Sequence, residues 1–251
     1  MSETVLGLTT LACVLGGILM GVLLRNALPD HHLSGDTKDV VRLGTGLIGT
    51  LAALVLGLLI GNAKSSYDTQ TAQVKQFTAN IVLLDYLLAE YGDDARPLRE
   101  LMRHGIGATV DRIWRQRGSR PAAPFEATQE GEALFLGVQR LSPKNDMQRS
   151  LHARAVQTVG DLAQTRLALF TQQSDPIPIP FLAVLLFWLT CIFMSFSLFA
   201  QPSPMVIGAL VLFALSATGA IYLVSELGDP FSGIMQISSG PLRNALRPLG
   251  S

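Results

Sequence analysis

Long apolar stretches without a charged side chain lie at both ends of this sequence. The longest runs from residue 176 to residue 225, and two others cover residues 4 to 24 and residues 43 to 63. A helix of about 20 apolar residues crosses the roughly 30 Å hydrocarbon core of a bilayer, so the longest stretch has room for two spans. Residues 200 to 204, with the sequence AQPSP, provide a turn between them. The pattern therefore predicts four transmembrane helices.

The polar segment between these stretches has the spacing of helices. Apolar residues recur at intervals of three and four at Val74, Phe77, Ile81, Leu84, Leu88 and Tyr91. This spacing indicates a helix with one apolar seam. No glycine or proline lies between Gly61 and that seam, so we expect the second span to continue as one long helix. Further helices are expected from residue 96 to about 116, from 130 to 140, and after Ser142-Pro143, a candidate N-cap and first-turn proline.

Together these patterns predict an all-α integral membrane protein, with four transmembrane helices in two hairpins that flank a cytosolic helical bundle. We expect four parts in the chain: a first transmembrane hairpin, a helical module, a second hairpin and a cytosolic tail. They cover residues 1-63, 64-175, 176-225 and 226-251. The alternating prolines at the start of the third part cannot continue a helix, so they form a stiff link before the third span.

Composition excludes several classes of function. Hydrophobic residues make up 49% of the chain and charged residues 15%, which fits a membrane protein with a substantial polar part. The net charge is zero, so there is no electrostatic signature of nucleic-acid binding. Cys13 and Cys191 fall inside predicted spans, where a thiol acts as a small apolar group. No phosphate-binding loop or zinc-binding spacing accompanies the histidines, which include His31 and His32 in a short loop. We therefore expect no enzyme, no cofactor and no bound metal.

The topology follows from the number of spans. With four spans, both termini and the helical module share one side of the membrane. Lys and Arg are slightly more numerous on that side than in the first loop. By the positive-inside rule, the termini and the helical module therefore lie in the cytoplasm. The first apolar run lacks a preceding Lys or Arg and is longer than a signal-peptide core, so we expect an uncleaved span.

Small residues form a stripe along the second span. They repeat every four positions, at Gly49, Ala53, Gly57 and Gly61, and the first span carries Gly17 and Gly21. Small side chains let helix backbones approach closely, which favours helix association in lipid. Packing inside one hairpin and packing between copies of the chain both explain the stripe.

A row of bulky residues lies about 200° around the second span from this stripe. It consists of Leu51, Val55 and Leu58 and ends in an amide at Asn62. Exposure to lipid is the simpler explanation. In a ring of such helices, however, the same side chains would form a hydrophobic constriction that controls ion flow by dewetting. No ionisable residue lies in any span, which disfavours a pump or an ion-coupled transporter.

Two carboxylates mark the end of the fourth span. Glu226 and Asp229 lie three positions apart, and Pro230 stops the helix from continuing. A calcium ion needs six to eight oxygen ligands, and no further carboxylate follows in the sequence. We therefore expect these carboxylates to cap the helix or to pair with a basic residue rather than to bind a metal.

Three segments of the chain resemble bestrophins, and in particular bacterial bestrophin-like membrane proteins. Residues 56 to 68 (LGLLIGNAKSSYD) are similar to the end of the bestrophin pore helix, and residues 177 to 181 (IPIPF) resemble the start of its third span. Residues 226 to 233 (ELGDPFSG) are similar to the acidic-Pro-Phe-Gly motif after the last span, which here contains Pro230 and Phe231. Thr69-Gln70 replaces an aromatic pair, and the sequence after Phe231 lacks the acidic cluster of bestrophins, so calcium control and anion selectivity are not implied.

Bestrophins are pentameric ion channels in which the second span of each subunit lines a hydrophobic neck. The resemblance therefore implies a homo-oligomer in the lipid bilayer of a bacterial inner membrane, with Leu51, Val55 and Leu58 in that neck. The permeant ion is not specified by any residue pattern. A second hypothesis is a non-conducting membrane scaffold or sensor that acts through its helical module. Recording currents from Leu51→Ala separates the two, because a widened neck conducts more whereas a scaffold carries no current.

Overall fold

The computed structural model describes residues 3–29, 35–114, 129–172, 179–200, 203–228, 230–231 and 234–246. All regular structure in these ranges is helical. The helices are α1 (Glu3–Ala27), α2 (Gly35–Tyr91), η2 (Asp93–Ala95), α3 (Arg96–Trp114), α4 (Gln129–Gln139), α5 (Asp146–Gln172), α6 (Ile179–Phe199), α7 (Pro204–Leu227) and α8 (Gly240–Leu246). Four of them, α1, α2, α6 and α7, are long and apolar enough to cross a membrane, so the protein is an all-α membrane protein as predicted. His31, His32, residues 201 and 202 of the expected turn between the last two spans, and residues 176 to 178 of the expected proline link lie outside the described ranges.

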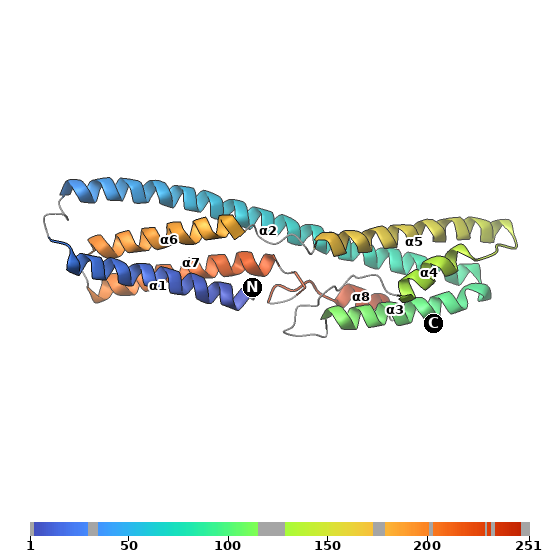
Figure 1. Cartoon of the computed structure of the whole chain (residues 1–251). Coiled ribbons are helices and arrows are strands. Elements are labelled where there is room, and N and C mark those ends of the chain that lie inside the picture. The colour runs from blue at the N-terminus through green and yellow to red at the C-terminus, as the bar shows by residue number, and fades with distance from the viewer. Residues whose placement is uncertain are drawn as a thin grey trace. The chain divides into compact units, whose positions relative to one another are not determined.

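The chain divides into two compact units. Unit 1 contains residues 1–66 and 176–228, and unit 2 contains residues 67–175 and 229–251. Residues 229–251, most of the expected tail, fall in the same unit as the helical module. Helix α2 contributes its first part to unit 1 and its second part to unit 2, without a break (Figure 1). Its 57 residues confirm the expectation of one long helix.

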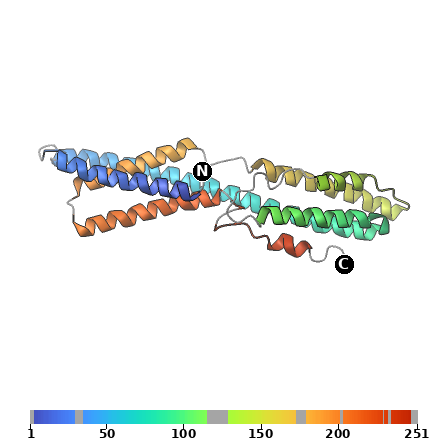
Figure 2. The same cartoon turned by 60° about the horizontal axis from the view of Figure 1, so that its bottom comes forward.

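In unit 1, helix α1 packs against α6 and α7 (Figures 1 and 2). The buried centre of this packing consists of Val14, Phe193, Leu210 and Ala214. At one end of α1, Arg25 donates a hydrogen bond to the backbone carbonyl of Ala200, just after α6. Helix α7 begins as its sequence suggests, because the Ser203 hydroxyl accepts a hydrogen bond from the backbone N–H of Val206, and Pro204 occupies the first turn.

Unit 2 is a helical bundle with its own hydrophobic core. The seam predicted along the second part of α2 forms one side of this core, as expected: Val74, Phe77, Ile81, Leu84, Leu88 and Tyr91 are all buried. Helices α3, α4 and α5 supply the other sides, with Met102, Val138 and Val159 among the buried residues. Helix α8 packs against α3 (Figure 2).

Two chain features set the ends of the unit 2 helices. Helix α2 ends just before Gly92, which has a φ of 110°, a backbone conformation that residues other than glycine rarely adopt. The predicted N-cap of α5 is wrong: the helix begins at Asp146, not after Ser142-Pro143. The side-chain oxygen of Asn145 accepts a hydrogen bond of 2.7 Å from the backbone N–H of Gln148, so Asn145 takes the capping role.

Candidate functional site: the open face of helix α2 and the terminal motif

The membrane part of α2 is the least covered of the four candidate spans. Only 11% of the residues in its apolar window are buried within the chain, against 33% for α1. Ala52, Leu59 and Ala63 face the interior of unit 1. A hydrogen bond of 3.0 Å from the Thr45 hydroxyl to the Ser195 hydroxyl connects this side of α2 to α6. The rest of the circumference is open within a single chain.

The predicted neck residues lie on this open circumference. Leu51 is 42% exposed and Leu58 is 51% exposed, Val55 is half-buried, and Asn62 is exposed. At 100° per residue, all four lie on one side of the buried face of α2. One chain thus presents a single continuous row of apolar side chains that ends in an amide.

The glycine stripe of α2 lies on the other side of its buried face, and it is open as well. A Cβ atom built on Gly49, Gly57 or Gly61 would meet no atom within 4 Å, and Ala53 is exposed. Packing of the stripe within one hairpin, the simpler of the two explanations, is therefore not seen at these three glycines. Small residues on an uncovered face leave room for another backbone to approach.

The glycines of α1 are in a different situation. A Cβ on Gly17 would lie 2.8 Å from the backbone carbonyl oxygen of Thr190, and one on Gly21 would collide with that of Met194. The Ser197 hydroxyl donates a hydrogen bond of 2.8 Å to the carbonyl of Ile18 in the same region. These glycines thus bring α1 against α6 and not against the stripe of α2.

The terminal motif divides between the two units. Glu226, in the last turn of α7, is 1% exposed and accepts a hydrogen bond of 2.5 Å from the Tyr222 hydroxyl. Sequence reasoning missed Tyr222, although its position four residues earlier places it on the same face of the helix. Asp229 lies outside the described residues, so the expected basic partner of the two carboxylates stays a prediction. Pro230 is buried, and Phe231 belongs to the core of unit 2.

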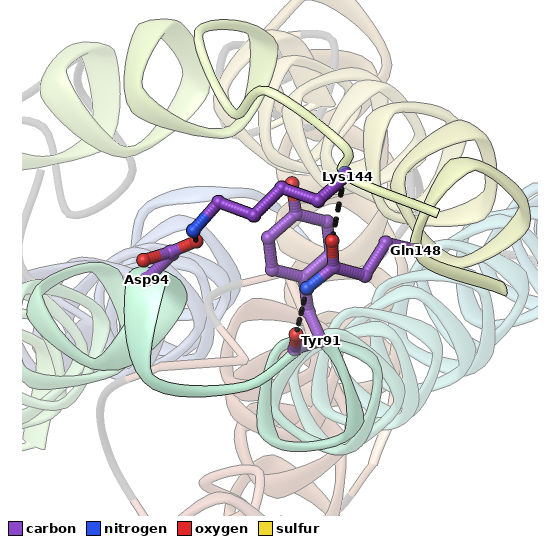
Figure 3. Close-up of polar contacts among 4 residues, drawn as sticks. All are labelled: Tyr91, Asp94, Lys144 and Gln148. Atoms are coloured by element: carbon purple, nitrogen blue, oxygen red, sulfur yellow. Dashed lines mark hydrogen bonds and ion pairs between the residues drawn. The ribbon is translucent and has the colours of Figure 1, made fainter. Parts of the chain in front are cut away.

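Polar contacts close the far end of the α2 core in unit 2 (Figure 3). The Gln148 side chain donates a hydrogen bond of 2.9 Å to the carbonyl of Tyr91 and accepts one of 2.8 Å from the backbone N–H of Lys144. The Lys144 ammonium lies 2.5 Å from the Asp94 carboxylate, and this hydrogen bond raises the pKa of Lys144. The four residues fix the end of α2 to the start of α5, which is a structural role.

A second ion pair joins α2 to α3. The Arg99 guanidinium donates two hydrogen bonds to the Asp85 carboxylate, of 2.8 and 3.1 Å, and both side chains are largely buried. The contact with Asp85 raises the pKa of Arg99. Neither pair brings together the residues of a catalytic site. Across the described residues, no cluster of three or more His, Cys, Asp or Glu side chains could hold a metal ion.

Comparison with known structures identifies the same fold in bacterial bestrophin homologues. One crystal structure of a bestrophin homologue from Klebsiella pneumoniae, a single-residue variant, is 14% identical with a TM-score of 0.66, covering 94% of this chain and 96% of that one. A second variant of the homologue is 15% identical with a TM-score of 0.66, covering 96% and 97%. A third is 16% identical with a TM-score of 0.64, covering 96% of each chain. At these identities the likeness establishes the fold alone.

Sequence comparison supplies the family. No curated protein matches the chain. The family model described as the Bestrophin-like domain matches residues 12–242, which include all of α2 to α7 and the terminal motif. The resemblance noted in three short segments therefore extends over most of the sequence. This chain belongs to the Bestrophin-like family.

Proposed function

We propose that this protein is the subunit of an oligomeric ion channel in a bacterial inner membrane, with a hydrophobic neck formed by α2. Membership of the Bestrophin-like family supports a channel in general. The observation that carries the neck is the open row on α2, where Leu51 and Leu58 are about half exposed in the single chain. In this arrangement the helical module and both termini face the cytoplasm.

The open row suits a neck because of its composition. Leu51, Val55 and Leu58 present only hydrocarbon, so a ring of such side chains holds water poorly when it is narrow. An ion that passes the ring must lose part of its hydration, and a small increase in width restores the water. Asn62 follows at the end of the row and would offer ions a polar amide as they leave the neck.

The open glycine stripe supports the assembly that such a neck requires. Four helices of about 20 residues cannot enclose a pore and also pack against each other, so the pore needs several subunits. Gly49, Gly57 and Gly61 leave space for the helix of a neighbouring subunit, and the leucine row on the other side of the buried face is then free to face the axis. By resemblance to bestrophins, the expected number of subunits is five.

The test is to record currents from purified protein in planar bilayers, for the wild type and for Leu51→Ala. We expect Leu51→Ala to conduct about twofold more or better, because a smaller side chain widens and wets the neck. Leu19→Ala is the matched control, since Leu19 is an exposed leucine on α1, outside the proposed neck, and its truncation should leave the current unchanged.

Three results would contradict the proposal. A complete lack of current from all variants, with intact protein in the bilayer, would favour the scaffold or sensor. Equal increases for Leu51→Ala and Leu19→Ala would mean that Leu51 does not line the neck. A mass measurement of detergent-solubilised protein that gives one 27.0 kDa chain per particle would exclude a pore shared between subunits.

A further inference from the structure

A short turn follows the last transmembrane helix and is held firmly at its base. The backbone N–H of Ile237 donates a hydrogen bond of 2.8 Å to the carbonyl of Pro230, and the Gln236 side chain donates one of 2.8 Å to the carbonyl of Phe231. The side chains of Phe231 and Ile237 are both buried in the core of unit 2. The base of the turn is therefore part of that core.

The tip of the same turn presents apolar side chains to the outside. Ile234 is 83% exposed and Met235 is 39% exposed. Turns are usually built from Gly, Pro, Asn, Asp and Ser, and a β-branched apolar residue at an outer position is unusual. A fixed base with an apolar tip is what a contact surface requires, because the side chains are displayed without a cost in backbone ordering.

Two properties of the sequence around the tip indicate what it contacts. Helix α7 ends at Leu227, and a fully extended chain from there to Ile234 reaches about 25 Å at most, so the length of the chain keeps Ile234 within that distance of the end of α7. From Pro230 to the end of the sequence the charged residues are Arg243 and Arg247, with no Asp or Glu. Arg243 is exposed on α8, next to the buried Leu242.

We propose that Ile234 and Met235 rest on the membrane surface, inserted among lipid headgroups, with Arg243 close to lipid phosphates. Apolar side chains next to basic residues and without acidic ones are the combination that binds an anionic bilayer surface. A second copy of the chain would also cover the apolar tip. The uncompensated positive charge favours anionic lipid as the partner.

Fluorescence quenching in the full-length protein tests this contact. Cys13 and Cys191, the two cysteines of the sequence, are first replaced by serine, and a bimane label is attached to Ile234→Cys. The protein is placed in nanodiscs of equimolar phosphatidylcholine and phosphatidylglycerol with a nitroxide on a lipid headgroup. The matched control is Met147→Cys, because Met147 is an exposed apolar residue of α5 in the same unit.

We expect the lipid-attached nitroxide to quench the label at position 234 about twofold or more strongly than the label at position 147, and a water-soluble quencher to show the reverse order. The difference should shrink in pure phosphatidylcholine and in the Arg243→Gln background, because both changes remove the electrostatic attraction. Neither measurement depends on ion conduction, so the lipid contact is tested independently of the proposed channel.

Other outcomes overturn the inference. Equal lipid quenching at positions 234 and 147 would mean that the tip does not touch the bilayer. Protection of position 234 from both quenchers, together with excimer emission when pyrene replaces bimane, would assign the tip to a second copy of the chain. Lipid quenching that is the same in neutral and anionic bilayers would remove Arg243 from the contact.

Discussion

The small residues of α1 and those of α2 follow similar patterns but have opposite surroundings. Gly17 and Gly21 lie against the backbone of α6, so the interface that they form is complete within one chain. On α2, a Cβ atom built on Gly49, Gly57 or Gly61 would meet no other atom within 4 Å. A small-residue spacing thus predicts close approach of a backbone, but it does not identify the backbone that approaches. The glycines of α1 therefore stabilise the fold of one chain, whereas those of α2 are available for the proposed contact between subunits.

The largest effect is expected from Gly21→Leu, on the complete interface. The new side chain would collide with the backbone carbonyl of Met194, which cannot move without shifting α6, so the protein should lose about 3 kcal/mol of stability. Thermal unfolding in detergent measures this loss. Gly16→Leu is the control, because Gly16 on the same helix has open space around it. Similar unfolding temperatures for both variants would contradict the difference between the two sides of α1.

A different effect is expected from Gly57→Leu, on the open stripe. The single chain has room for the leucine, so the unfolding temperature of the subunit should change little, whereas subunit association should weaken by about tenfold, or about 1.4 kcal/mol. Cross-linking in detergent at several protein concentrations measures the association. Leu58→Ala is the control, since a truncation does not push backbones apart. Equal yields of oligomer from both variants would argue against the stripe as a subunit contact.

The smallest effect is expected from Ser197→Ala, which removes the hydrogen bond from Ser197 to the carbonyl of Ile18. Hydrogen bonds between helices in a membrane contribute about 0.6 kcal/mol on average, so the complete interface should weaken only slightly. Thermal unfolding of Ser197→Ala next to Gly21→Leu shows whether close packing or this hydrogen bond holds α1 on α6. A loss of stability as large as that of Gly21→Leu would mean that this hydrogen bond contributes as much as close packing to the contact between α1 and α6.

Sequence reasoning succeeded where one physical signal dominates. Long uncharged stretches predicted the four spans, because charged side chains are costly in hydrocarbon. The spacing from Val74 to Tyr91 predicted the buried face of α2 in unit 2, because in water only that face can be apolar. The same reasoning located α3 and α4 to within a few residues, although the start of α5 was wrong because Asn145, rather than Ser142, caps that helix.

The sequence did not reveal which helices the spans pack against. A span that is apolar all round gives no face to compare, so nothing in the composition of α1 indicates that it packs against α6 and α7. The contact between Tyr222 and Glu226 was not predicted, because a neutral hydroxyl one turn away carries no charge that would mark it as the partner of a carboxylate. For the proposed neck residues, the row was predicted from the sequence and its exposure is seen in the structure, whereas a position around a pore axis stays part of the proposal.

The uninterrupted course of α2 has a mechanical consequence. Its 57 residues correspond to about 85 Å of helix, far more than the roughly 30 Å thickness of the hydrocarbon core. No glycine or proline interrupts it from residue 62 to Tyr91, so each turn is joined to the next by backbone hydrogen bonds and there is no hinge to absorb torsion. A rotation of the segment around Phe77 is therefore carried along α2 as far as Asn62, the amide at the end of the apolar row.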